Sequence, residues 1–358
     1  MFLELSYIPC AAHNLQLVIK DGLKLDDCYT KLIDRVSTDI VSKSKCCSSV
    51  ADELRVFNKK LNKKNLTRWN STLFMIRSVL KLTPVEFALI RNKLPSKTEK
   101  QKQTKKNFNL TAIERKMLEE LKQVLEMFEF VSDELQADGV TISKVYPCID
   151  FLKKKLILHL DMCEYSKQIR EELLISLNDR FKNCDQNETY VVASFLDSTF
   201  GLDVFEDNKK EMIKNKIKNL LEIERLKNEA KILTSINKEQ SNLKKKDHDI
   251  VIKRNNNFIF YRKEESIEND DLESSIDEYI RAIKSTGFTC TLIFWKNNHL
   301  KFPELANLAK KYLGVPASSA SAERMFSISG HIFSSKRRRM GAKIFSELVY
   351  LKLNDDKF

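Results

Sequence analysis

The segment YLGVPASSASAERMFSISGHIFSSKRRRM, residues 312–340, carries the densest pattern in the chain. Pro316 followed by serines is typical of a helix N-terminus, because proline fits the first helical turn and serine hydroxyls cap its free N–H groups. The sequence therefore predicts a helix that carries Glu323. Its predicted packing surface consists of Ala322, Met325, Phe326 and Ile328.

The composition of the whole chain also favours helices. A chain of 358 residues is long enough for about two domains. It has only 7 glycines and 6 prolines, which leaves little material for the turns of a many-stranded β fold. Its 8 cysteines are scattered without a C-x-x-C pair, which suits reduced thiols better than a disulfide framework.

The charge balance points to an acidic partner. The formal net charge is +12, and no run of 18 or more apolar residues occurs, so a polyanion is favoured over a bilayer core. A generally lysine-rich composition is the alternative explanation of the charge. The first ten residues lack the basic and apolar regions of a secretory signal, so we expect an intracellular protein.

Hydrophobic periodicity predicts helices along most of the chain. After one expected strand at the start, we expect a helix over 11–24 and another after Arg68–Thr72, capped by Asn70 or Ser71 and disturbed by Pro84. Residues 95–109 are polar and cationic and predict a solvated loop or linker. Further predicted helices cover residues 110–139, about 142–160, 164–183, 209–246, and the region from 276 onward.

The opening segment, together with residues upstream and downstream, resembles the C-terminal dimerisation region of the hAT transposase superfamily. The matching residues are Trp295, Pro303, Leu305, Ala309, Ser318, Ser319, Ala320, Glu323, Arg324, Phe326, Ser327, Arg337, Arg339 and Asn354. The resemblance implies self-association through about residues 290–358, and an apolar closing helix is costly to leave in water. Packing within the chain is the alternative. The residues expected at the dimer contact are Leu305, Leu308, Tyr312, Leu313, Phe326, Leu348 and Leu351.

Two shorter motifs resemble the same family. Cys10-Ala-Ala-His13 is similar to the C-x-x-H motif that follows the second catalytic aspartate, and it also has the spacing of half a zinc site, which would need a second ligand pair. Capping, packing or an active-site contact are its other interpretations. The RWNST segment, Arg68–Thr72, resembles a motif whose tryptophan is implied to stack on a flipped DNA base. Trp69 as an anchor between helices is the alternative.

A third segment departs from the family pattern. The residues SFLDSTFG, Ser194–Gly201, resemble the family's LDPRFK segment, but Ser198 and Thr199 stand where proline and arginine are usual. The lost cation implies that a DNA or structural contact made there in relatives is absent from this chain.

By the same resemblance, Glu323 matches the last member of a D-D-E set, whose carboxylates hold two divalent metal ions for DNA strand cleavage and transfer. A surface glutamate paired with Arg324 or a lysine is the alternative. Only nine residues precede Cys10, so the two aspartates expected upstream have no place in these 358 residues. We therefore expect a catalytically incomplete protein, not an enzyme, with no cofactor. Magnesium would matter only in a complete parent enzyme.

The expected fold is mainly α, a helical insertion domain plus the remnant of an RNase H-like fold whose N-terminal sheet strands, with any BED-type zinc finger, are missing. Residues 1–95 form the N-terminal remnant with the two motifs. Residues 96–280 form the helical insertion region, with a lysine-rich mobile segment at about 205–275. Residues 281–358 form the dimerisation region.

The expected partners are a second copy of the chain and double-stranded DNA, in the nucleus and without a membrane. For Lys336–Arg339, nuclear import, phosphate contact and a merely solvated charge run stay open. The alternative function is the C-terminal fragment of an active DDE-type transposase whose N-terminal part is missing from the gene model. The candidate DNA-binding residues are Trp69, Arg68, His13, Lys336, Arg337, Arg338 and Arg339.

Overall fold

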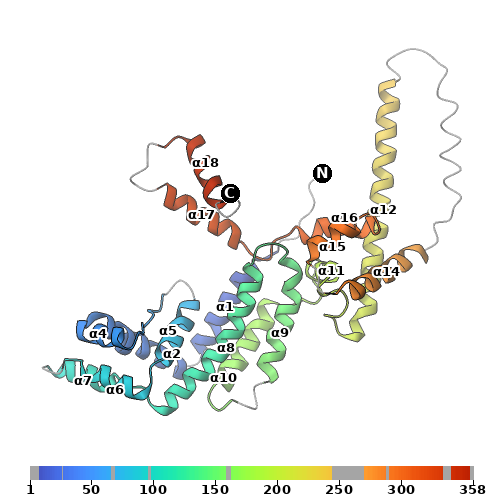
Figure 1. Ribbon diagram of the computed structural model, residues 1–358. Helices are drawn as coiled ribbons and strands as arrows, with labels where there is room; N and C mark the ends of the chain where they lie inside the picture. Colours follow the sequence, from blue (N-terminus) through green and yellow to red (C-terminus); the bar gives the residue numbers. More distant parts are fainter. Residues whose placement is uncertain are drawn as a thin grey trace. The chain divides into compact units, whose positions relative to one another are not determined.

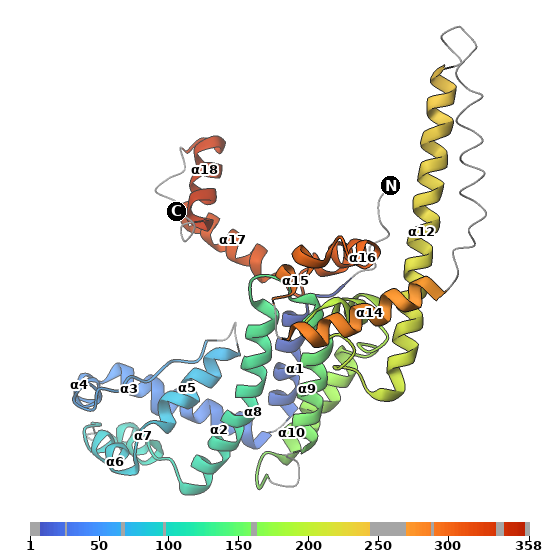
Figure 2. The same ribbon diagram turned by 45° about the vertical axis from the view of Figure 1, so that its right-hand side comes forward.

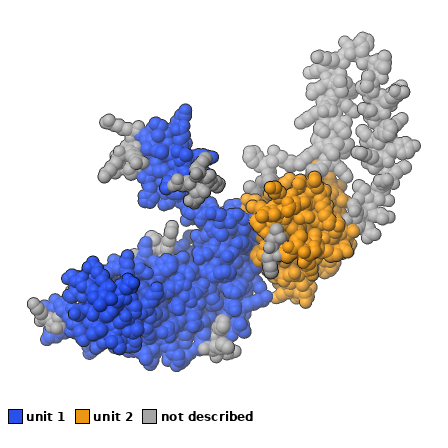
Figure 3. Space-filling model, in the orientation of Figure 1, with its two compact units in different colours: residues 1–184, 316–358 blue, residues 185–315 orange. Residues whose placement is uncertain are grey.

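The computed structural model describes residues 8–25, 27–65, 69–95, 98–158, 163–243, 270–287, 290–333 and 340–354. Within these ranges the secondary structure is helical and contains no strand, so the prediction of a mainly α chain is confirmed. The chain forms two compact units (Figure 3): unit 1 comprises residues 1–184 and 316–358, and unit 2 comprises residues 185–315.

The helices of each unit are as follows. Unit 1 contains α1 (Ala11–Leu25), α2 (Asp27–Arg35), the π-helix η1 (Val36–Ser42), α3 (Lys43–Cys46), α4 (Ser48–Val56), α5 (Asn70–Leu80), α6 (Pro84–Asn92), α7 (Glu99–Asn107), α8 (Ala112–Gln136), the short 3₁₀-helix η2 (Ile142–Lys144), α9 (Val145–Leu158), α10 (Lys167–Arg180), α17 (Ala320–Ile332) and α18 (Ala342–Leu353). Unit 2 contains α11 (Glu188–Leu196), α12 (Asp207–Leu243), α14 (Asp270–Thr286), α15 (Thr291–Asn298) and α16 (Pro303–Leu313).

The core of unit 1 is a group of four helices, α1, α8, α9 and α10, that pack side by side (Figure 1). The face of α1 predicted from periodicity lies inside, because Leu15, Val18 and Ile19 are fully buried. Helices α1 and α10 approach closely at Gly22, where an added Cβ would lie 2.6 Å from Cδ2 of Leu173. The predicted helices over 11–24, 110–139, 142–160 and 164–183 are thereby confirmed, with small shifts at their ends.

Helix α8 is the longest element of this core, and its start follows from a reciprocal cap. The Glu114 N–H donates to Oγ1 of Thr111 at 3.2 Å, while the Thr111 N–H donates to the Glu114 carboxylate at 2.9 Å. The helix ends at Gln136, and Gly139 beyond it adopts a φ of +91°, which favours glycine. The buried face consists of Leu118, Leu121, Val124, Leu125, Phe128, Val131, Ser132 and Leu135.

Three predictions for the segment between α4 and α8 are wrong. Neither Asn70 nor Ser71 caps α5; Trp69 occupies the N-cap position without a side-chain cap, and the Ser71 hydroxyl bonds instead to the backbone of Asn65. Pro84 does not disturb α5, because it is the first residue of α6, which Thr83 and Glu86 cap reciprocally.

The predicted loop or linker at residues 95–109 is the third error, since α7 lies within it. Its first turn is capped by Thr98, whose hydroxyl accepts the Gln101 N–H at 3.2 Å, and Gln103 donates to Asn107 one turn later at 3.0 Å. Phe108, fully buried, anchors its end. A helix of this kind is held by caps and tertiary contacts and has no hydrophobic period of its own.

Unit 2 is built around the ring of Tyr279. Its centroid lies 5.3 Å from that of Phe195, 5.4 Å from Trp295 and 5.8 Å from Phe302, and its hydroxyl donates to the Phe195 carbonyl at 3.0 Å. Burial raises the pKa of Tyr279 well above its ordinary value. The aromatic cluster ties α11, α14 and α15 into one core.

The segment Ser194–Gly201 belongs to this core. Asp197 is 3% exposed and accepts hydrogen bonds from the Thr199 N–H at 2.9 Å and from the Thr291 hydroxyl. The indole of Trp295 donates to the Leu196 carbonyl at 2.9 Å. Although the cation usual in the family is absent, the segment here makes structural contacts that close the end of α11.

The two compact units divide the chain differently from the three segments predicted from the sequence. The packing separates residues at 184 and 315, whereas the predicted segments meet at 95 and 280. The division into three segments, which was drawn from motifs and composition, therefore stays a prediction. None of the described helices is long and apolar enough to span a membrane.

Candidate functional site

Helix α17 joins the core of unit 1 through the residues that precede it. The Ala11 N–H at the start of α1 donates to the Ala317 carbonyl at 2.9 Å, and the Ala317 N–H donates to the Thr141 hydroxyl at 3.0 Å. The first bond satisfies an N–H at the first turn of α1, and both bonds hold the residues that precede α17. Residues more than 300 positions apart in sequence thus become neighbours.

Ser319 connects Cys10 with Glu323. Its N–H and its hydroxyl lie 3.4 and 3.5 Å from the Cys10 sulfur, and the hydroxyl also lies 2.8 Å from Oε1 of Glu323. A single hydroxyl proton serves one of these acceptors at a time, and the charged carboxylate is the stronger one. The first residue of the C-x-x-H motif and the candidate acidic residue therefore share one contact.

Arg324 fixes the first turns of α17 from the other side. Its guanidinium donates to the Gln136 carbonyl at 3.2 Å, at the end of α8, and to the Asp138 carboxylate at 2.9 Å. The pairing of Glu323 with Arg324 that the sequence left open is therefore not what forms, because Arg324 pairs with Asp138 and Glu323 with Ser319. Glu323 itself stays exposed.

These helix ends surround an open pocket of about 570 Å³ in unit 1. The start of α1 contributes His13, the start of α5 contributes Trp69, and α17 contributes Glu323, so three residues singled out from the sequence line one cavity. Its complete lining is Cys10, Ala12, His13, Gln16, Trp69, Asn70, Gln136, Ala320, Glu323, Arg324, Ser327 and Ile328. Trp69 is half-buried and His13 is exposed, so both side chains can be reached from solvent.

The chemistry of the pocket suits a polar or charged ligand with one flat group. It offers an indole face, an imidazole, a carboxylate, a guanidinium and three carboxamides, from Gln16, Asn70 and Gln136. Across the described residues, no group of three or more His, Cys, Asp or Glu side chains is arranged to hold a metal ion. The lining groups of the pocket are suited to stacking and to hydrogen bonding.

Some predicted DNA-binding residues cannot be placed. Arg68 and all of Lys336–Arg339 lie outside the described residues. Sequence reasoning missed Gln136 and Asn70, which line the pocket, and Asp138, which pairs with Arg324. No local pattern marks the end of a helix as a pocket wall, although the family pattern located the part of the lining around Glu323.

The seven residues predicted at the dimer contact fall into two groups. Leu305, Leu308, Tyr312 and Leu313 are buried within unit 2, where α16 packs on α11. The hydroxyl of Tyr312 donates to Glu188 at 2.6 Å, and burial, the main cause, with Glu188 beside it, raises its pKa beyond the ordinary range. These four side chains stabilise the unit's own core and do not form a free surface.

The second group lies on a hairpin of α17 and α18, joined by a ring contact of 5.8 Å between the centroids of Phe333 and Phe345. Neither helix has a buried residue. Phe326 is 70% exposed, Leu351 is 52% exposed and Leu348 is half-buried. The predicted packing surface of α17 is thus left open in the single chain.

Comparison with known proteins assigns both ends of the chain. Residues 275–354 match the hAT family C-terminal dimerisation region, and residues 8–124 match the ZBED1 RNase-like helical domain. The AC transposase of Zea mays is 22% identical over 97% of this chain and 44% of its own length. Zinc finger BED domain-containing protein 4 of Homo sapiens is 18% identical over 98% of this chain and 29% of its own length.

The chain thus spans less than half the length of these curated relatives. The pocket lies where the two matched regions meet within unit 1, since residues of 8–124 and of 275–354 both line it. The resemblance inferred from the sequence motifs is confirmed: residues 275–354 match the hAT family C-terminal dimerisation region, and the chain is related to the AC transposase and to zinc finger BED domain-containing protein 4.

Proposed function

We propose that this chain self-associates through the α17–α18 hairpin and binds double-stranded DNA in the nucleus. The observation that carries the proposal is the hairpin itself, which lies in the matched dimerisation region and leaves every side chain unburied. Burying a large apolar side chain contributes about 1.5–3 kcal/mol, so a second copy that covers several of them is stabilised. The exposed apolar residues are Met325, Phe326, Phe333, Ile344, Tyr350, Leu351 and Leu353.

Light scattering on the purified chain tests this proposal. We expect a mass twice that of the chain, and we expect the double variant Phe326→Asp with Leu351→Asp to have the mass of a single chain. The matched control is Val85→Asp with Ile175→Asp, which alters two equally exposed apolar residues outside the hairpin. A single-chain mass for the unaltered protein at all concentrations sinks the proposal, as does a dimer that survives the hairpin variant.

The proposed DNA contact is supported by the pocket and by charge. A net charge of +12 favours a polyanionic partner, and a half-buried indole beside carboxamides suits an unstacked base, with stacking worth about 1–3 kcal/mol. We expect Trp69→Ala to weaken binding of a duplex with an unpaired base by about tenfold, and binding of a fully paired duplex much less. Equal effects on both duplexes would argue for an anchoring role of Trp69.

For strand-transfer chemistry, we propose that this chain alone is inactive, with Glu323 as the only carboxylate of the resembled set. Two-metal catalysis needs the full set to hold the ions and stabilise developing charge. We further propose that the helices of unit 1 descend from the part of a transposase that lies against an RNase H-like sheet. DNA cleavage by this chain in magnesium, lost in Glu323→Gln, would overturn the proposal of inactivity.

Nuclear import is the remaining element of the proposal, and it rests on Lys336–Arg339. A fluorescent fusion of the chain is expected to concentrate in the nucleus, and replacement of the four basic residues by glutamine is expected to abolish that. An even distribution of the unaltered fusion contradicts nuclear import by this segment.

A further inference from the structure

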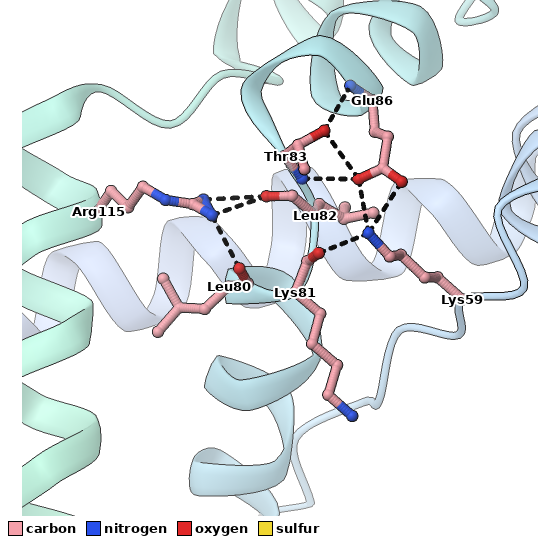
Figure 4. A network of polar contacts seen from close by, with 7 residues as sticks. All are labelled: Lys59, Leu80, Lys81, Leu82, Thr83, Glu86 and Arg115. Atoms are coloured by element: carbon pink, nitrogen blue, oxygen red, sulfur yellow. Dashed lines mark hydrogen bonds and ion pairs between the residues drawn. The ribbon is translucent and has the colours of Figure 1, made fainter.

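Residues 59–65, which connect α4 to α5, form neither helix nor strand, yet they are fastened along their length. We call this segment the strap. Its first residue, Lys59, donates to the Lys81 carbonyl at 2.6 Å and to both carboxylate oxygens of Glu86 at 2.8 and 2.6 Å (Figure 4). One ammonium therefore ties the strap to the turn between α5 and α6.

Three further residues hold the strap against α5. Leu61 is 2% exposed. The Asn62 N–H donates to the hydroxyl of Ser78 at 3.0 Å, and the Asn65 N–H donates to the hydroxyl of Ser71 at 2.8 Å. Since later strap residues contact earlier residues of α5, the strap runs antiparallel along that helix (Figure 2). Its backbone is thus ordered before any partner arrives.

Two lysines of the strap are accessible to a binding partner. Lys60 and Lys63 are exposed and have no ion-pair partner among the residues that the structure describes, whereas Lys64 lies 3.3 Å from Asp34. Three residues of extended chain span at most about 10 Å. The flexible stems of the two lysines can therefore each bring an ammonium group to a phosphate of one DNA strand.

The strap ends at the pocket. Asn65 contacts Ser71 in the first turn of α5, and the same turn places Trp69 and Asn70 in the pocket wall. We propose that the strap is a backbone-binding rail for duplex DNA, with Lys60 and Lys63 contacting phosphates of one strand and setting the position of that strand relative to the pocket. This inference rests on the proposed DNA binding and adds the surface that performs it.

Phosphate contacts from fixed positions set register without reading sequence. An acidic protein segment is the competing partner for a pair of lysines. It is disfavoured because the first turn of α5, which the strap contacts, also places an indole in the pocket wall, and a nucleic-acid base can stack on that indole whereas aspartate and glutamate side chains offer no aromatic face.

The experiment measures binding of a fluorescent random-sequence duplex by anisotropy across a series of salt concentrations, with the full chain. The test variant is Lys60→Gln with Lys63→Gln, and Lys60→Arg with Lys63→Arg keeps the charge. The matched control is Lys20→Gln with Lys182→Gln, which removes two exposed lysines of unit 1 that also lack an ion-pair partner among the described residues. Poly-glutamate serves as the competing acidic polymer.

We expect the strap variant to lose affinity on the order of tenfold at low salt, and the slope of log K against log[salt] to fall by about 1 for each lysine. The arginine variant and the control should keep the slope of the unaltered chain. Equal losses in strap variant and control, or poly-glutamate competing as well as DNA at equal charge, overturn the rail while leaving DNA binding intact. Absence of duplex binding by the unaltered chain overturns both.

Discussion

Single residues determine how closely the core helices of unit 1 approach, and Gly22 is the clearest case. A Cβ at this position would lie 2.6 and 2.7 Å from two side-chain carbons of Leu173, closer than packed atoms tolerate. At Gly330 in α17, by contrast, an added Cβ would have no atom within 4 Å. The same substitution should therefore have opposite effects at the two positions.

We expect Gly22→Ala to lower the free energy of unfolding. Overpacking costs about 1–3 kcal/mol, which exceeds the gain of up to roughly 1 kcal/mol in helix propensity. Gly330→Ala should instead stabilise α17 by up to about 1 kcal/mol. Urea titration of both variants measures the difference, and a Gly22→Ala variant as stable as the unaltered chain would show that Leu173 moves aside freely.

The carboxyl of Glu86 supports a second prediction for a single residue, which concerns the stability of the fold at acidic pH. Lys59 and the backbone of Thr83 donate to it and lower its pKa from 4.5 to about 2. Because the folded pKa lies below the unfolded one, the carboxylate stabilises the fold fully above about pH 4.5, and this contribution is lost as the pH falls toward 2.

Thermal unfolding of Glu86→Gln between pH 2 and 7 tests this sign. We expect a lower melting temperature than that of the unaltered chain at pH 7, with the difference closing between about pH 4.5 and 2. Glu99→Gln, which removes a carboxylate that is 88% exposed, is the control and should track the unaltered chain. A difference that stays constant with pH would contradict the assigned role of Glu86.

Among the elements, α8 and α7 explain what the sequence could and could not predict. Helix α8 was predicted because Leu121, Val124 and Phe128 recur at helical spacing and all are buried. Helix α7 was missed because its lysines and glutamines have no apolar period, and its helix depends on the cap at Thr98 and on Phe108 packing into the core. Hydrophobic periodicity identifies helices that bury one face. It does not identify a helix such as α7, which is stabilised by contacts at its two ends.

The pocket shows the same limit over longer distances. Cys10, Trp69 and Glu323 were each singled out through family motifs, and their meeting in one pocket depends on tertiary bonds such as Ala11 to Ala317. The pairing of Arg324 with Asp138 could not be predicted from local sequence, which offered only a pairing of Glu323 with Arg324 or a lysine as one alternative. Local sequence motifs identify candidate residues, but long-range tertiary contacts determine which of these residues become neighbours.

The hairpin of α17 and α18 provides the prediction at the scale of elements. With no buried side chain, its amides should exchange hydrogen quickly in dilute single chains, whereas those of α8 should exchange slowly. At concentrations where copies associate, we expect exchange in the hairpin to slow by at least about tenfold, with α8 unchanged. A hairpin equally protected in dilute solution would mean that the chain covers it without a partner.

For the whole molecule, self-association and DNA binding should reinforce each other. A dimer carries two straps and two pockets, so a duplex long enough to reach both is held at two places, and its dissociation requires both contacts to open. Linked sites of this kind raise apparent affinity by about 10²–10⁴ without any new contact. A short duplex engages one copy only and gains nothing from the second.

We therefore expect the hairpin variant Phe326→Asp with Leu351→Asp to bind a duplex of about 12 base pairs as well as the unaltered chain does. On a duplex of about 60 base pairs, it should bind at least tenfold more weakly. The control Val85→Asp with Ile175→Asp should match the unaltered chain on both. Equal weakening on the short and the long duplex would place the two hairpin residues in the DNA contact itself, and no weakening on either would separate self-association from DNA binding.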